Sequence, residues 1–378
     1  MNKTAMYAFS GDPITNGHIN IIDRVSDIFD TVIVAIGVNP NKKHTFNLDE
    51  RLNLATHTLS MYKNVNVISF KGLLVDCAYE NGVDVLIRGI RNQADFDYEE
   101  MLHNVNVSQE LGIETMCVFA DSKLSHISSS AVKALMKEKG FIHDYVPLYV
   151  KQGLEEKLSN VTVMGLTGTI GSGKSFIAQK IITECNATPV NILHLDLDKI
   201  AHDILNRLDE PGYVKVRKEI TNTWSDVVLG ADGFIDRKAL GQLVFGDPDA
   251  LAELNDIMRE PLLVRIRKEM RDFRDGIILV DGALLVEAGL NVLCNNNLIV
   301  LDVDKRTQIN RLHKRGGSSE QIERRISSQY SFDRKMSKLN MEQQFHNHGT
   351  VLSLDNSEET DEIMIAINLY IKELRGDA

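Results

Sequence analysis

Two unrelated motifs that can hold nucleotide phosphates lie on this single chain. The first runs Asp12-Pro13-Ile14-Thr15-Asn16-Gly17-His18 and leads into a helical pattern. The second, Gly168 to Ser175, is a complete P-loop. Each follows an apolar, strand-like run, and the first turn of a helix offers unpaired N–H groups and a positive dipole end to an anion. The sequence therefore predicts two nucleotide-dependent steps.

The P-loop predicts a site for ATP. Its glycines let backbone N–H groups turn toward a phosphate, Lys174 reaches the β and γ phosphates, and the Ser175 hydroxyl is a ligand for Mg²⁺. The flanking strand and helix favour a true P-loop over a chance match. The candidate ATP-binding residues are Gly168, Thr169, Ile170, Gly171, Ser172, Gly173, Lys174, Ser175 and Phe176.

Two carboxylates follow the next predicted strand of this half. Asp196 and Asp198 are two residues apart, so along a strand they would point to the same side. That side faces the crevice at the carboxyl ends of the strands. One of the two could orient Mg²⁺ or its waters, and the other could take a proton from an acceptor hydroxyl. The competing interpretation is that Asp198 caps the helix that starts near Lys199.

Polar residues gather at strand ends in the first half as well. Gly17 permits close backbone approach, and His18 can donate a hydrogen bond to phosphate oxygens as charge builds in a transition state. Arginines around a glycine, Arg88-Gly89-Ile90-Arg91, suit bidentate phosphate binding. The competing interpretations are a plain helix start with a surface histidine, and ordinary N-caps for the serines Ser128 to Ser130.

These residues need a scaffold that brings strand ends together, and apolar runs alternate with helical patterns throughout the chain. This alternation predicts βαβ units and parallel sheets in both halves. A boundary near Ser159 separates domains 1–158 and 159–378. The predicted strands are Met6–Phe9, Thr31–Val38, Val65–Phe70, Val83–Ile87, Thr115–Phe119, Val161–Leu166, Ile192–Leu195, Ile277–Val280, Leu298–Val303 and Thr350–Leu354, with helices including Phe96–Leu111, Ser129–Lys137 and Ser175–Cys185.

Composition narrows the class of protein. The 378 residues suit two domains, and 43% hydrophobic with 25% charged residues indicates a globular fold. The net charge of -11 argues against a general nucleic-acid binder. Four scattered cysteines without a C-x-x-C pair predict free, buried thiols in a reducing compartment rather than a zinc site. No signal-peptide pattern or apolar run of membrane-spanning length is visible, so we expect no membrane association and a cytoplasmic location.

The second half resembles the dephospho-coenzyme A kinase family. The matching segments are Leu166 to Ser175, Asp196-Leu197-Asp198, Glu210-Pro211-Gly212, Asp232 to Leu240, Asp281 to Leu290, Gln308 to Arg315, Arg325 to Gln329, and Asp355-Asn356-Ser357. The resemblance implies transfer of the ATP γ-phosphoryl group to the 3′-hydroxyl of dephospho-CoA, with Asp198 as base and Lys174 on the phosphates. It also implies a cationic lid containing Arg311, Lys314 and Arg315. Glu260 departs from the family, which usually has histidine there.

The first half resembles the phosphopantetheine adenylyltransferases. The matching segments are Asp12 to His18, Lys42-Lys43, Leu48 to Arg51, Leu86 to Arg91, Asp95 to Glu99 and Ile127 to Ser130. The resemblance implies 4′-phosphopantetheine contacts from Ser10, Lys42, Leu74 and Arg88. It implies ATP contacts from Ser10, Gly11, His18, Gly89, Ile90, Arg91, Glu99, Leu124, Ser125, His126, Ile127, Ser128, Ser129 and Ser130. No protein nucleophile is needed, because the substrate phosphate attacks the α-phosphorus of ATP while His18 stabilises the developing charge.

This half also departs from its family. Phe9-Ser10-Gly11 replaces the usual Gly-Thr-Phe, and Leu124 and His126 replace an aromatic pair. The resemblance further implies a homo-oligomer, because such adenylyltransferases commonly form homohexamers.

The two implied reactions are consecutive, since the product of the first is the substrate of the second. The resulting hypothesis is a fused transferase of two α/β domains, a Rossmann-like nucleotidyltransferase followed by a P-loop kinase, each using Mg²⁺ and ATP. Two alternatives stay open: a chain with only the kinase half active, and a nucleotide- or CoA-binding regulator that performs no chemistry.

Overall fold

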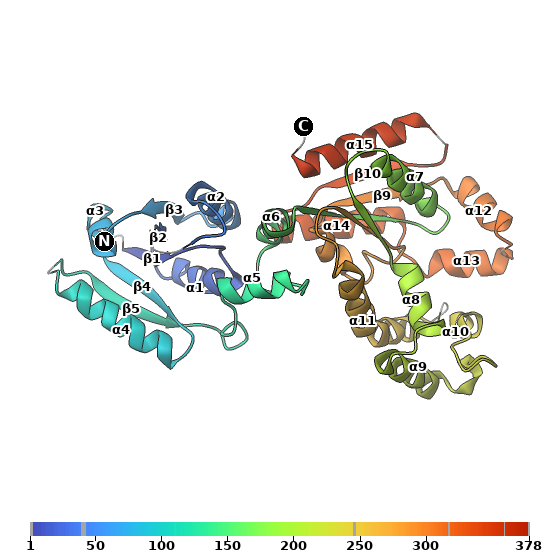
Figure 1. Ribbon diagram of the computed structural model, residues 1–378, viewed down its shortest axis with the longest axis horizontal. Helices are drawn as coiled ribbons and strands as arrows, with labels where there is room; N and C mark the ends of the chain where they lie inside the picture. The colour runs from blue at the N-terminus through green and yellow to red at the C-terminus, as the bar shows by residue number, and fades with distance from the viewer. Residues whose placement is uncertain are drawn as a thin grey trace. The chain divides into compact units, whose positions relative to one another are not determined.

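The computed structural model describes residues 3–38, 43–109, 111–244, 247–316, 318–358 and 360–376, with only the backbone of Pro248. The chain separates into two compact units, Met1–Leu158 and Ser159–Ala378. Each unit contains a parallel sheet of five strands with helices packed on it, so the expected α/β class is confirmed. Figure 1 labels the elements of both units.

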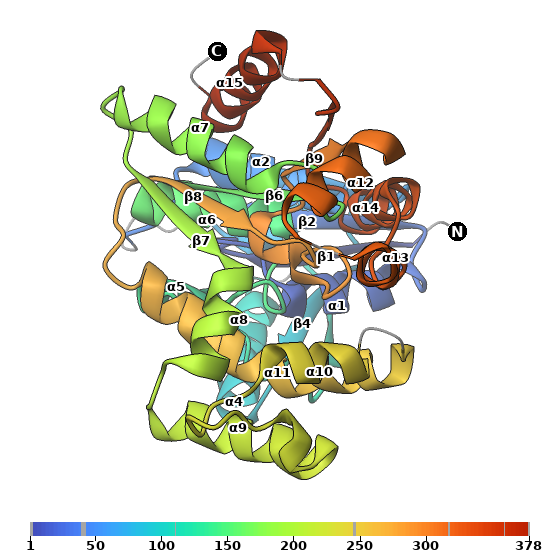
Figure 2. The same cartoon turned by 90° about the vertical axis from the view of Figure 1, so that its right-hand side faces the viewer.

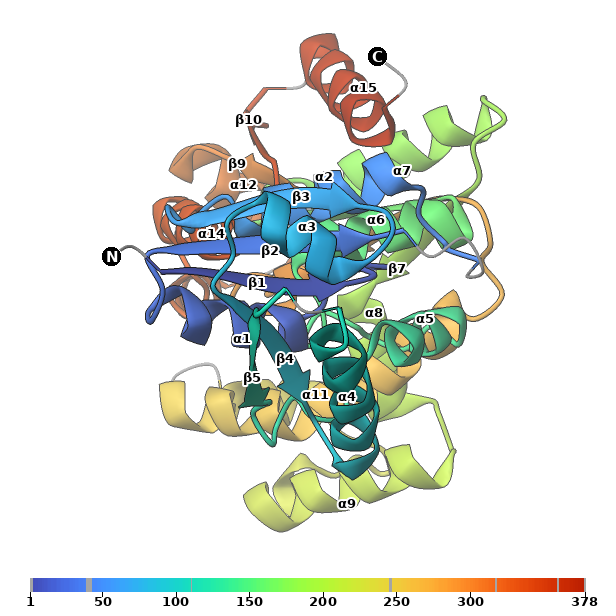
Figure 3. The same cartoon turned by 90° about the vertical axis from the view of Figure 1, so that its left-hand side faces the viewer.

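The sheet of the first unit has the strand order β3-β2-β1-β4-β5, and Figure 3 shows it with α4 beside β4. Its elements are β1 (Thr4–Phe9), α1 (Asn16–Ser26), β2 (Thr31–Gly37), α2 (Leu48–Leu59), β3 (Val65–Phe70), α3 (Leu74–Glu80), β4 (Val85–Ile90), α4 (Gln93–Val107), β5 (Glu114–Phe119), α5 (Ser129–Lys137) and α6 (Leu148–Ser159). From β1 the chain adds strands on one side, β2 and then β3, and afterwards on the other side, β4 and then β5. Ligands of such sheets bind at this switch point, so we expect the site in the crevice beside the carboxyl ends of β1 and β4.

Alternation along β1 sends its side chains into two hydrophobic clusters. Ala5 and Tyr7 pack with residues of α1, α2, α5 and α6, whereas Met6 packs with residues of α3. Both faces of the strand are therefore covered, as expected where the sheet is parallel. This packing fixes the end of β1, and with it the Asp12–His18 segment.

The second sheet has the order β10-β9-β6-β8-β7, with β6 in its centre. The elements are β6 (Val161–Gly168), α7 (Lys174–Asn186), β7 (Ile192–Asp196), α8 (Leu197–Asn206), α9 (Pro211–Trp224), η1 (Asp226–Val228), α10 (Arg237–Val244), α11 (Pro248–Met270), β8 (Gly276–Asp281), η2 (Leu290–Cys294), β9 (Leu298–Asp302), α12 (Lys305–Lys314), α13 (Ser319–Ser327), α14 (Phe332–His346), β10 (Val351–Asp355) and α15 (Asp361–Arg375). All eight residues of β6 are buried, so the P-loop follows a fully enclosed strand of this unit.

Helices cover this sheet in two groups. Residues of α7 and α15 form one cluster with the strands β6, β8 and β9. The helices α8 and α11 contact β7, and α14 contacts β9. Figure 2 shows α9, α10 and α11 gathered near α8 in this unit. The helices α7, α8 and α12 each begin shortly after the carboxyl end of a strand, β6, β7 and β9 respectively.

Most predicted strands are confirmed, and the departures are local. β4 begins at Val85 and ends at Ile90, so Arg88 and Gly89 lie within the strand rather than after it. α4 begins at Gln93 because Asn92 caps it, and it ends at Val107. Three cysteines are buried as predicted, but Cys117 is exposed because it lies on the edge strand β5.

Within the described residues, no helix is long and apolar enough to cross a membrane. The cytoplasmic location stays a prediction.

Candidate active sites

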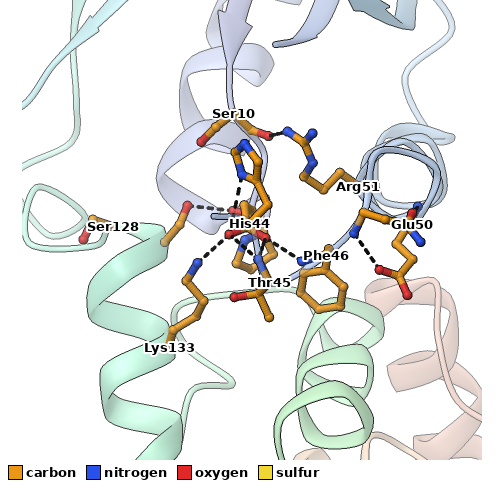
Figure 4. Close-up of polar contacts among 12 residues, drawn as sticks. Ser10, His44, Thr45, Phe46, Glu50, Arg51, Ser128 and Lys133 are labelled. Atoms are coloured by element: carbon orange, nitrogen blue, oxygen red, sulfur yellow. Dashed lines mark hydrogen bonds and ion pairs between the residues drawn. The ribbon is translucent and has the colours of Figure 1, made fainter. Parts of the chain in front are cut away.

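The Asp12 carboxylate connects three segments of the first unit. It accepts hydrogen bonds from the backbone N–H groups of Thr45, at 3.0 Å, and Phe46, at 2.9 Å, and from Lys133 Nζ at 2.5 Å. Figure 4 shows Lys133 reaching in from α5. Burial alone would raise the pKa of Asp12, but these donors outweigh it and lower the pKa below its ordinary value. Asp12 therefore connects the segment around Thr45 and Phe46 to the middle of α5.

Arg51 connects the ends of β1 and β2. This buried guanidinium donates to the carbonyl oxygens of Ser10, at 2.6 Å, and Gly37, at 2.9 Å (Figure 4). Burial lowers the pKa of Arg51. Arg51 thus holds the backbone of Ser10, a residue that is a candidate contact for both substrates, in place.

The His18 side chain is held at the first turn of α1. Its Nδ1 accepts a hydrogen bond from the Thr15 backbone N–H at 3.0 Å and lies 2.8 Å from Thr15 Oγ1. The imidazole stacks on the Phe9 ring, with centroids 4.2 Å apart. Burial, together with the nearby Arg91 charge, lowers the pKa of His18 to about 4. The histidine is therefore neutral near pH 7, with its proton on Nε2.

The exchange of Phe and Gly around Ser10 has a structural explanation. Phe9 supplies the aromatic surface on which His18 stacks. Gly11 has a φ of +59°, in the left-handed region, and a Cβ there would lie 2.9 Å from Ile36 Cδ1. Glycine is the residue that fits this backbone and this space. The Phe9-Ser10-Gly11 sequence therefore fits the local backbone and supports the His18 ring.

Arg88 and Arg91 come from the end of β4 and are each paired with a carboxylate. Arg88, which is buried, lies with its Nε 3.1 Å from Glu99 Oε2 on α4. Arg91 donates to both oxygens of Asp95, from Nε at 2.7 Å and from Nη2 at 3.0 Å. Burial raises the pKa of Glu99, against the opposite effect of Arg88. The two arginines are thus oriented before any substrate arrives.

The three serines Ser128 to Ser130 lie at the start of α5, and each has a different environment. Ser128 is the N-cap and accepts from the Ala131 N–H at 3.1 Å, as the competing interpretation predicted. Ser129 Oγ donates to the Pro13 carbonyl at 2.8 Å, which joins α5 to the Asp12–His18 segment. Ser130 is exposed.

The residues before this run occupy different environments. Leu124 packs on the hydrophobic cluster, Ile127 is buried, and Ser125 Oγ donates to the Ser122 carbonyl. His126 is exposed and meets the Tyr145 ring edge-on. Gly89 lies against Tyr7 and Ile21, and Ile90 is buried.

Two phosphopantetheine candidates are separate from this group. Leu74 begins α3 and packs against the cluster that contains Met6 and Ile33. Lys42 lies outside the described residues, whereas its neighbour Lys43 is exposed. The segment that follows Lys43 is the one bound by Asp12.

The P-loop of the second unit is held by side chains from α12 and from the loops after β10 and α13. Gln308 Nε2 donates to the Ile170 carbonyl at 2.8 Å, and the Ile170 N–H donates to Gln329 Oε1 at 2.9 Å. Buried Asn356 donates to the Ser172 carbonyl at 2.7 Å. The loop is therefore shaped before nucleotide binds.

Lys174 begins α7, where Gly173 is the N-cap, and its Nζ lies 3.4 Å from the Gly168 carbonyl oxygen. Burial lowers its pKa, against the opposing effects of Asp198 and Asp281. Thr169 and Ile170 are partly buried, Gly171 and Ser172 are buried, and Ser175 and Phe176 are exposed. The ammonium group thus lies among backbone carbonyls and carboxylates, as a phosphate-binding lysine requires.

The predicted arrangement of Asp196 and Asp198 along one strand is wrong. β7 ends at Asp196, and α8 begins at Leu197, so Asp198 lies in the first turn of the helix. Asp196 is the N-cap and accepts from the Lys199 N–H at 2.9 Å, so the capping interpretation applies to Asp196 instead of Asp198. Residues two apart point in different directions on a helix.

Asp198 nevertheless lies close to Lys174. Its carboxylate keeps contact with solvent, yet surrounding protein atoms desolvate it and raise its pKa, against the attraction of Lys174. The backbone of Ala283 acts in the same direction as Lys174 and lowers the pKa of Asp198. A carboxylate with a raised pKa beside a phosphate loop is suited to accept a proton.

The three lid candidates have different surroundings. Arg311 is partly buried and donates to the carbonyl oxygens of Asn356, at 2.8 Å, and Gly171, at 3.4 Å. Lys314 and Arg315 are exposed at the end of α12. Arg311 thus supports the P-loop backbone, and only Lys314 and Arg315 extend into solvent.

Sequence reasoning missed the residues that hold these loops. Arg51 and Gln308 lie within segments that match the two families, but no contact was predicted for either of them. Lys133 and Lys335 lie outside the matching segments. A buried charged residue is hard to distinguish from a surface one in a single sequence, because both occur within amphipathic helices.

Comparisons with known proteins agree with the two families that the motifs resemble. The dephospho-CoA kinase family model matches residues 161–350, and the cytidylyltransferase-like model matches residues 10–135. The phosphopantetheine adenylyltransferase of Alkaliphilus metalliredigens is 43% identical over 155 residues, 41% of this chain and 99% of that protein. The phosphopantetheine adenylyltransferase of Carboxydothermus hydrogenoformans is 42% identical over 155 residues, 41% of this chain and 96% of that protein.

Among solved structures, the crystal structure of TT1252 from Thermus thermophilus covers 57% of this chain and 98% of its own, with 22% identity and a TM-score of 0.44. The kinase match spans half of this chain, and the adenylyltransferase relatives are covered almost from end to end. The chain belongs to the phosphopantetheine adenylyltransferase family through its first part and to the dephospho-CoA kinase family through its second.

Proposed function

We propose that residues 1–158 and 159–378 catalyse the last two steps of coenzyme A biosynthesis in succession. The first step joins the adenylyl group of ATP to 4′-phosphopantetheine and releases pyrophosphate. The second transfers the γ-phosphoryl group of a second ATP to the ribose 3′-hydroxyl of the resulting dephospho-CoA. The observation that carries the proposal is the presence of two separately built phosphate sites on a chain of these two families.

In the first step, a phosphate oxygen of 4′-phosphopantetheine attacks the α-phosphorus of ATP, and the bond to pyrophosphate breaks. The protein positions two anions and stabilises the charge that grows on the α-phosphate. Neutral His18 donates from Nε2, because Thr15 occupies Nδ1. Arg88 and Arg91, oriented by Glu99 and Asp95, hold the phosphates.

In the second step, Asp198 takes the proton of the 3′-hydroxyl as its oxygen bonds to the γ-phosphorus. Lys174 and the backbone N–H groups of the P-loop stabilise the transferred charge and the departing ADP. Lys314 and Arg315 extend from the end of α12 and are suited to cover the phosphates. The raised pKa of Asp198 makes it a stronger base than an ordinary aspartate.

The residues of the second site fit a magnesium ion. Ser175 offers a hydroxyl oxygen at the first turn of α7, next to Lys174. Oxygen donors of this kind are those that Mg²⁺ prefers, with the remaining positions filled by water and ATP phosphates. When bound, the ion neutralises charge on the phosphates.

Product analysis of the purified full chain tests the function. With 4′-phosphopantetheine, Mg²⁺ and ATP, a time course resolved by chromatography is expected to show dephospho-CoA rising first and CoA following. K174A is expected to stop at dephospho-CoA, whereas H18A is expected to make CoA only when dephospho-CoA is supplied.

Failure of the wild-type chain to form either product would overturn the proposal. CoA formed only from added dephospho-CoA would favour a chain with an inactive first half. Nucleotide binding without either product would favour a regulator.

We further infer a homo-oligomer, with the hexamer of related adenylyltransferases as the expected form. None of the residues of α4 is buried, and Met101, Val105 and Val107 on this helix are exposed with Met116 and Phe119 of β5. Exposed apolar surface of this kind typically lies in an interface. Light scattering of the full chain is expected to give a multiple of 42.4 kDa, and V105E a smaller species.

A further inference from the structure

The aromatic ring of Phe9, the last residue of β1, packs against the imidazole of His18. Residues two apart on a strand point to the same side, so Phe9 follows Ala5 and Tyr7 toward the hydrophobic cluster that contains residues of α1. The ring centroids of Phe9 and His18 are 4.2 Å apart, and the angle between the ring planes is 16°. The strand therefore presents the face of an aromatic ring to the face of the imidazole.

The Phe9 ring is itself confined by its neighbours. The Tyr7 ring lies at a centroid distance of 5.0 Å, with the two planes tilted by 48°. A Cβ atom added to Gly11 would lie 3.6 Å from Cε2 of Phe9 and 2.9 Å from Cδ1 of Ile36. The ring thus lies in contact distance of a position that carries no side chain in this protein. Phe9 has little room to move away from His18.

The imidazole of His18 is therefore constrained in two directions. In the plane of the ring, Nδ1 accepts the Thr15 N–H at 3.0 Å and lies 2.8 Å from Thr15 Oγ1. Perpendicular to that plane, Phe9 covers one face of the ring. A hydrogen bond tolerates a departure of about 30° from linearity, so the stacked aromatic ring is what limits the tilt of the imidazole. The two contacts together determine where the Nε2 proton points.

We propose that Phe9 is a positioning residue for adenylyl transfer, which keeps the imidazole of His18 in the orientation that directs its Nε2 proton at the α-phosphate of ATP. The inference rests on the proposed role of His18 as the donor that stabilises the developing charge. Phe9 stands where the family usually has glycine, so this support for the histidine comes from the chain's own sequence.

A purely structural role for Phe9 leads to a different expectation. An aromatic residue that only filled the hydrophobic cluster would stabilise the first unit, and its loss would leave the kinetics of each folded molecule unchanged. A positioning residue changes kcat, because a misdirected donor no longer stabilises the charge of the transition state. Its effect also disappears once the group through which it acts has been removed.

The test uses the full-length chain with F9L, the conservative variant F9Y and the control F29L. Leucine removes the aromatic face and keeps an apolar side chain, whereas tyrosine retains the ring. Phe29 is 5% exposed and belongs to the same hydrophobic cluster, but it lies beyond the opposite end of α1 from His18. F29L therefore measures the loss of an aromatic residue from the cluster without a change beside the imidazole.

For folded F9L we expect kcat of adenylyl transfer to fall by about 10- to 100-fold, as when a reacting group is slightly misplaced. The KM for ATP is expected to stay unchanged, F9Y to restore most of the lost rate, and F29L to behave as the wild type. The kinase rate of the same preparation, measured with dephospho-CoA, corrects for the amount of chain. If F9L does not fold, F9M takes its place, because methionine adapts to irregular space in a core.

The double variant F9L/H18A connects the effect to the histidine. If Phe9 acts through the imidazole, F9L lowers kcat in the wild-type background and has no further effect in the H18A background. An equal decrease in both backgrounds would overturn the inference, and so would equal kcat values for F9L and F29L.

H18A alone separates these results from a failure of the proposed function. If H18A loses the adenylyl-transfer rate while F9L keeps it, only the positioning role of Phe9 is wrong. If H18A keeps the wild-type rate, the role of His18 is wrong, and the inference falls with it. A wild-type chain that forms no dephospho-CoA would overturn the proposed function itself.

Discussion

The Nδ1 atom of His18 accepts the backbone N–H of Thr15 at 3.0 Å, which fixes the tautomer of the imidazole. A backbone N–H can only donate, so the proton of the neutral ring is on Nε2. Thr15 is almost fully buried, and the contact forms part of the capping box of α1. The same local structure that begins the helix therefore prepares a hydrogen-bond donor for phosphate.

Replacement of His18 tests this donor. We expect H18A to lower kcat of adenylyl transfer by about 100- to 1,000-fold, the usual loss when one transition-state donor is removed. The kinase step is expected to be unchanged, because it uses the other phosphate site. Separate assays with 4′-phosphopantetheine and with dephospho-CoA measure the two rates. H57A, on α2, is the matched control, and an equal effect of both variants would contradict the role of His18.

The pH dependence of the first reaction provides a second test. Burial lowers the pKa of His18 from 6.5 to about 4, so the neutral donor persists throughout the neutral and mildly acidic range. We expect no rate loss near pH 6.5 from this residue. An NMR titration of the His18 ring should show its midpoint near 4. A midpoint near 6.5 would show that the ring is not desolvated as described.

The same shift has a consequence for stability. The unfolded chain takes up the proton near pH 6.5, whereas the folded chain does so only near 4. The contribution of neutral His18 to folding is therefore complete above pH 6.5 and is lost as the pH falls toward 4. H18Q should show a smaller decrease in the melting temperature of the first unit over this interval than the wild type.

Asp12 is expected to matter through the segments it holds. In D12N an amide faces the donors Thr45, Phe46 and Lys133, and only its oxygen can accept. We expect a loss of about 2 to 3 kcal/mol in the free energy of unfolding of the first unit, because these hydrogen bonds involve a charged acceptor. The KM for 4′-phosphopantetheine should also rise as the segment after β2 loosens.

Urea unfolding followed by circular dichroism measures this loss, and Trp224 fluorescence provides an internal reference, since that residue lies in the second unit. D49N, which alters an exposed carboxylate of α2, serves as the control. The lowered pKa of Asp12 means that its contribution is present above the ordinary aspartate range and is lost as the pH falls through the folded value. Equal stability of D12N and D49N would contradict the proposed connection.

The sequence predicted the scaffold better than the contacts within it. The strands could be predicted because buried parallel strands are continuous apolar runs, as in β6 and β9, and polar or helical segments separate them in the sequence. The boundary of β4 was misplaced because Arg88 and Gly89 are weak strand formers, and pairing with β1 and β5 overrides that preference.

The phosphate motifs were visible because their chemistry is local in sequence. The orientation of Asp198 was not, since one residue decides whether the strand or the helix contains it. Lys335 and Lys133 reach their partners across 52 and 121 residues, so no short pattern could reveal them. The candidate phosphate-binding residues could thus be proposed from the sequence, whereas the residues that hold them in place required the tertiary structure.

Gly173 tests whether the shape of the P-loop is needed. Its φ is +91°, and an added methyl group would collide with Nδ2 of Asn356, which is itself bound to the Ser172 carbonyl. We expect G173A to raise the KM for ATP of the kinase step by about 10-fold or more, since backbone strain of this kind costs about 1–3 kcal/mol. G212A, where the methyl would meet nothing within 4 Å, is the control.

Adenylyl transfer should be unaffected by either glycine substitution. Nucleotide affinity measured by titration with ADP distinguishes a distorted loop from a slower chemical step. Unchanged ADP affinity in G173A would contradict the proposed preformed loop.

Asp198 can be tested through the protons it accepts. If it is the base, the kinase rate should fall as the pH drops through its folded pKa, which desolvation raises above 3.8. D198N removes the accepting carboxylate, so kcat should fall by about 100- to 10,000-fold and the remaining rate should lose this acidic limb. D209N changes an exposed carboxylate of the same unit and should retain both. Because a group that only bound the metal would raise the requirement for Mg²⁺ instead, the rate is measured across a magnesium titration. Full recovery of D198N at high Mg²⁺ would assign Asp198 to the ion rather than to the proton.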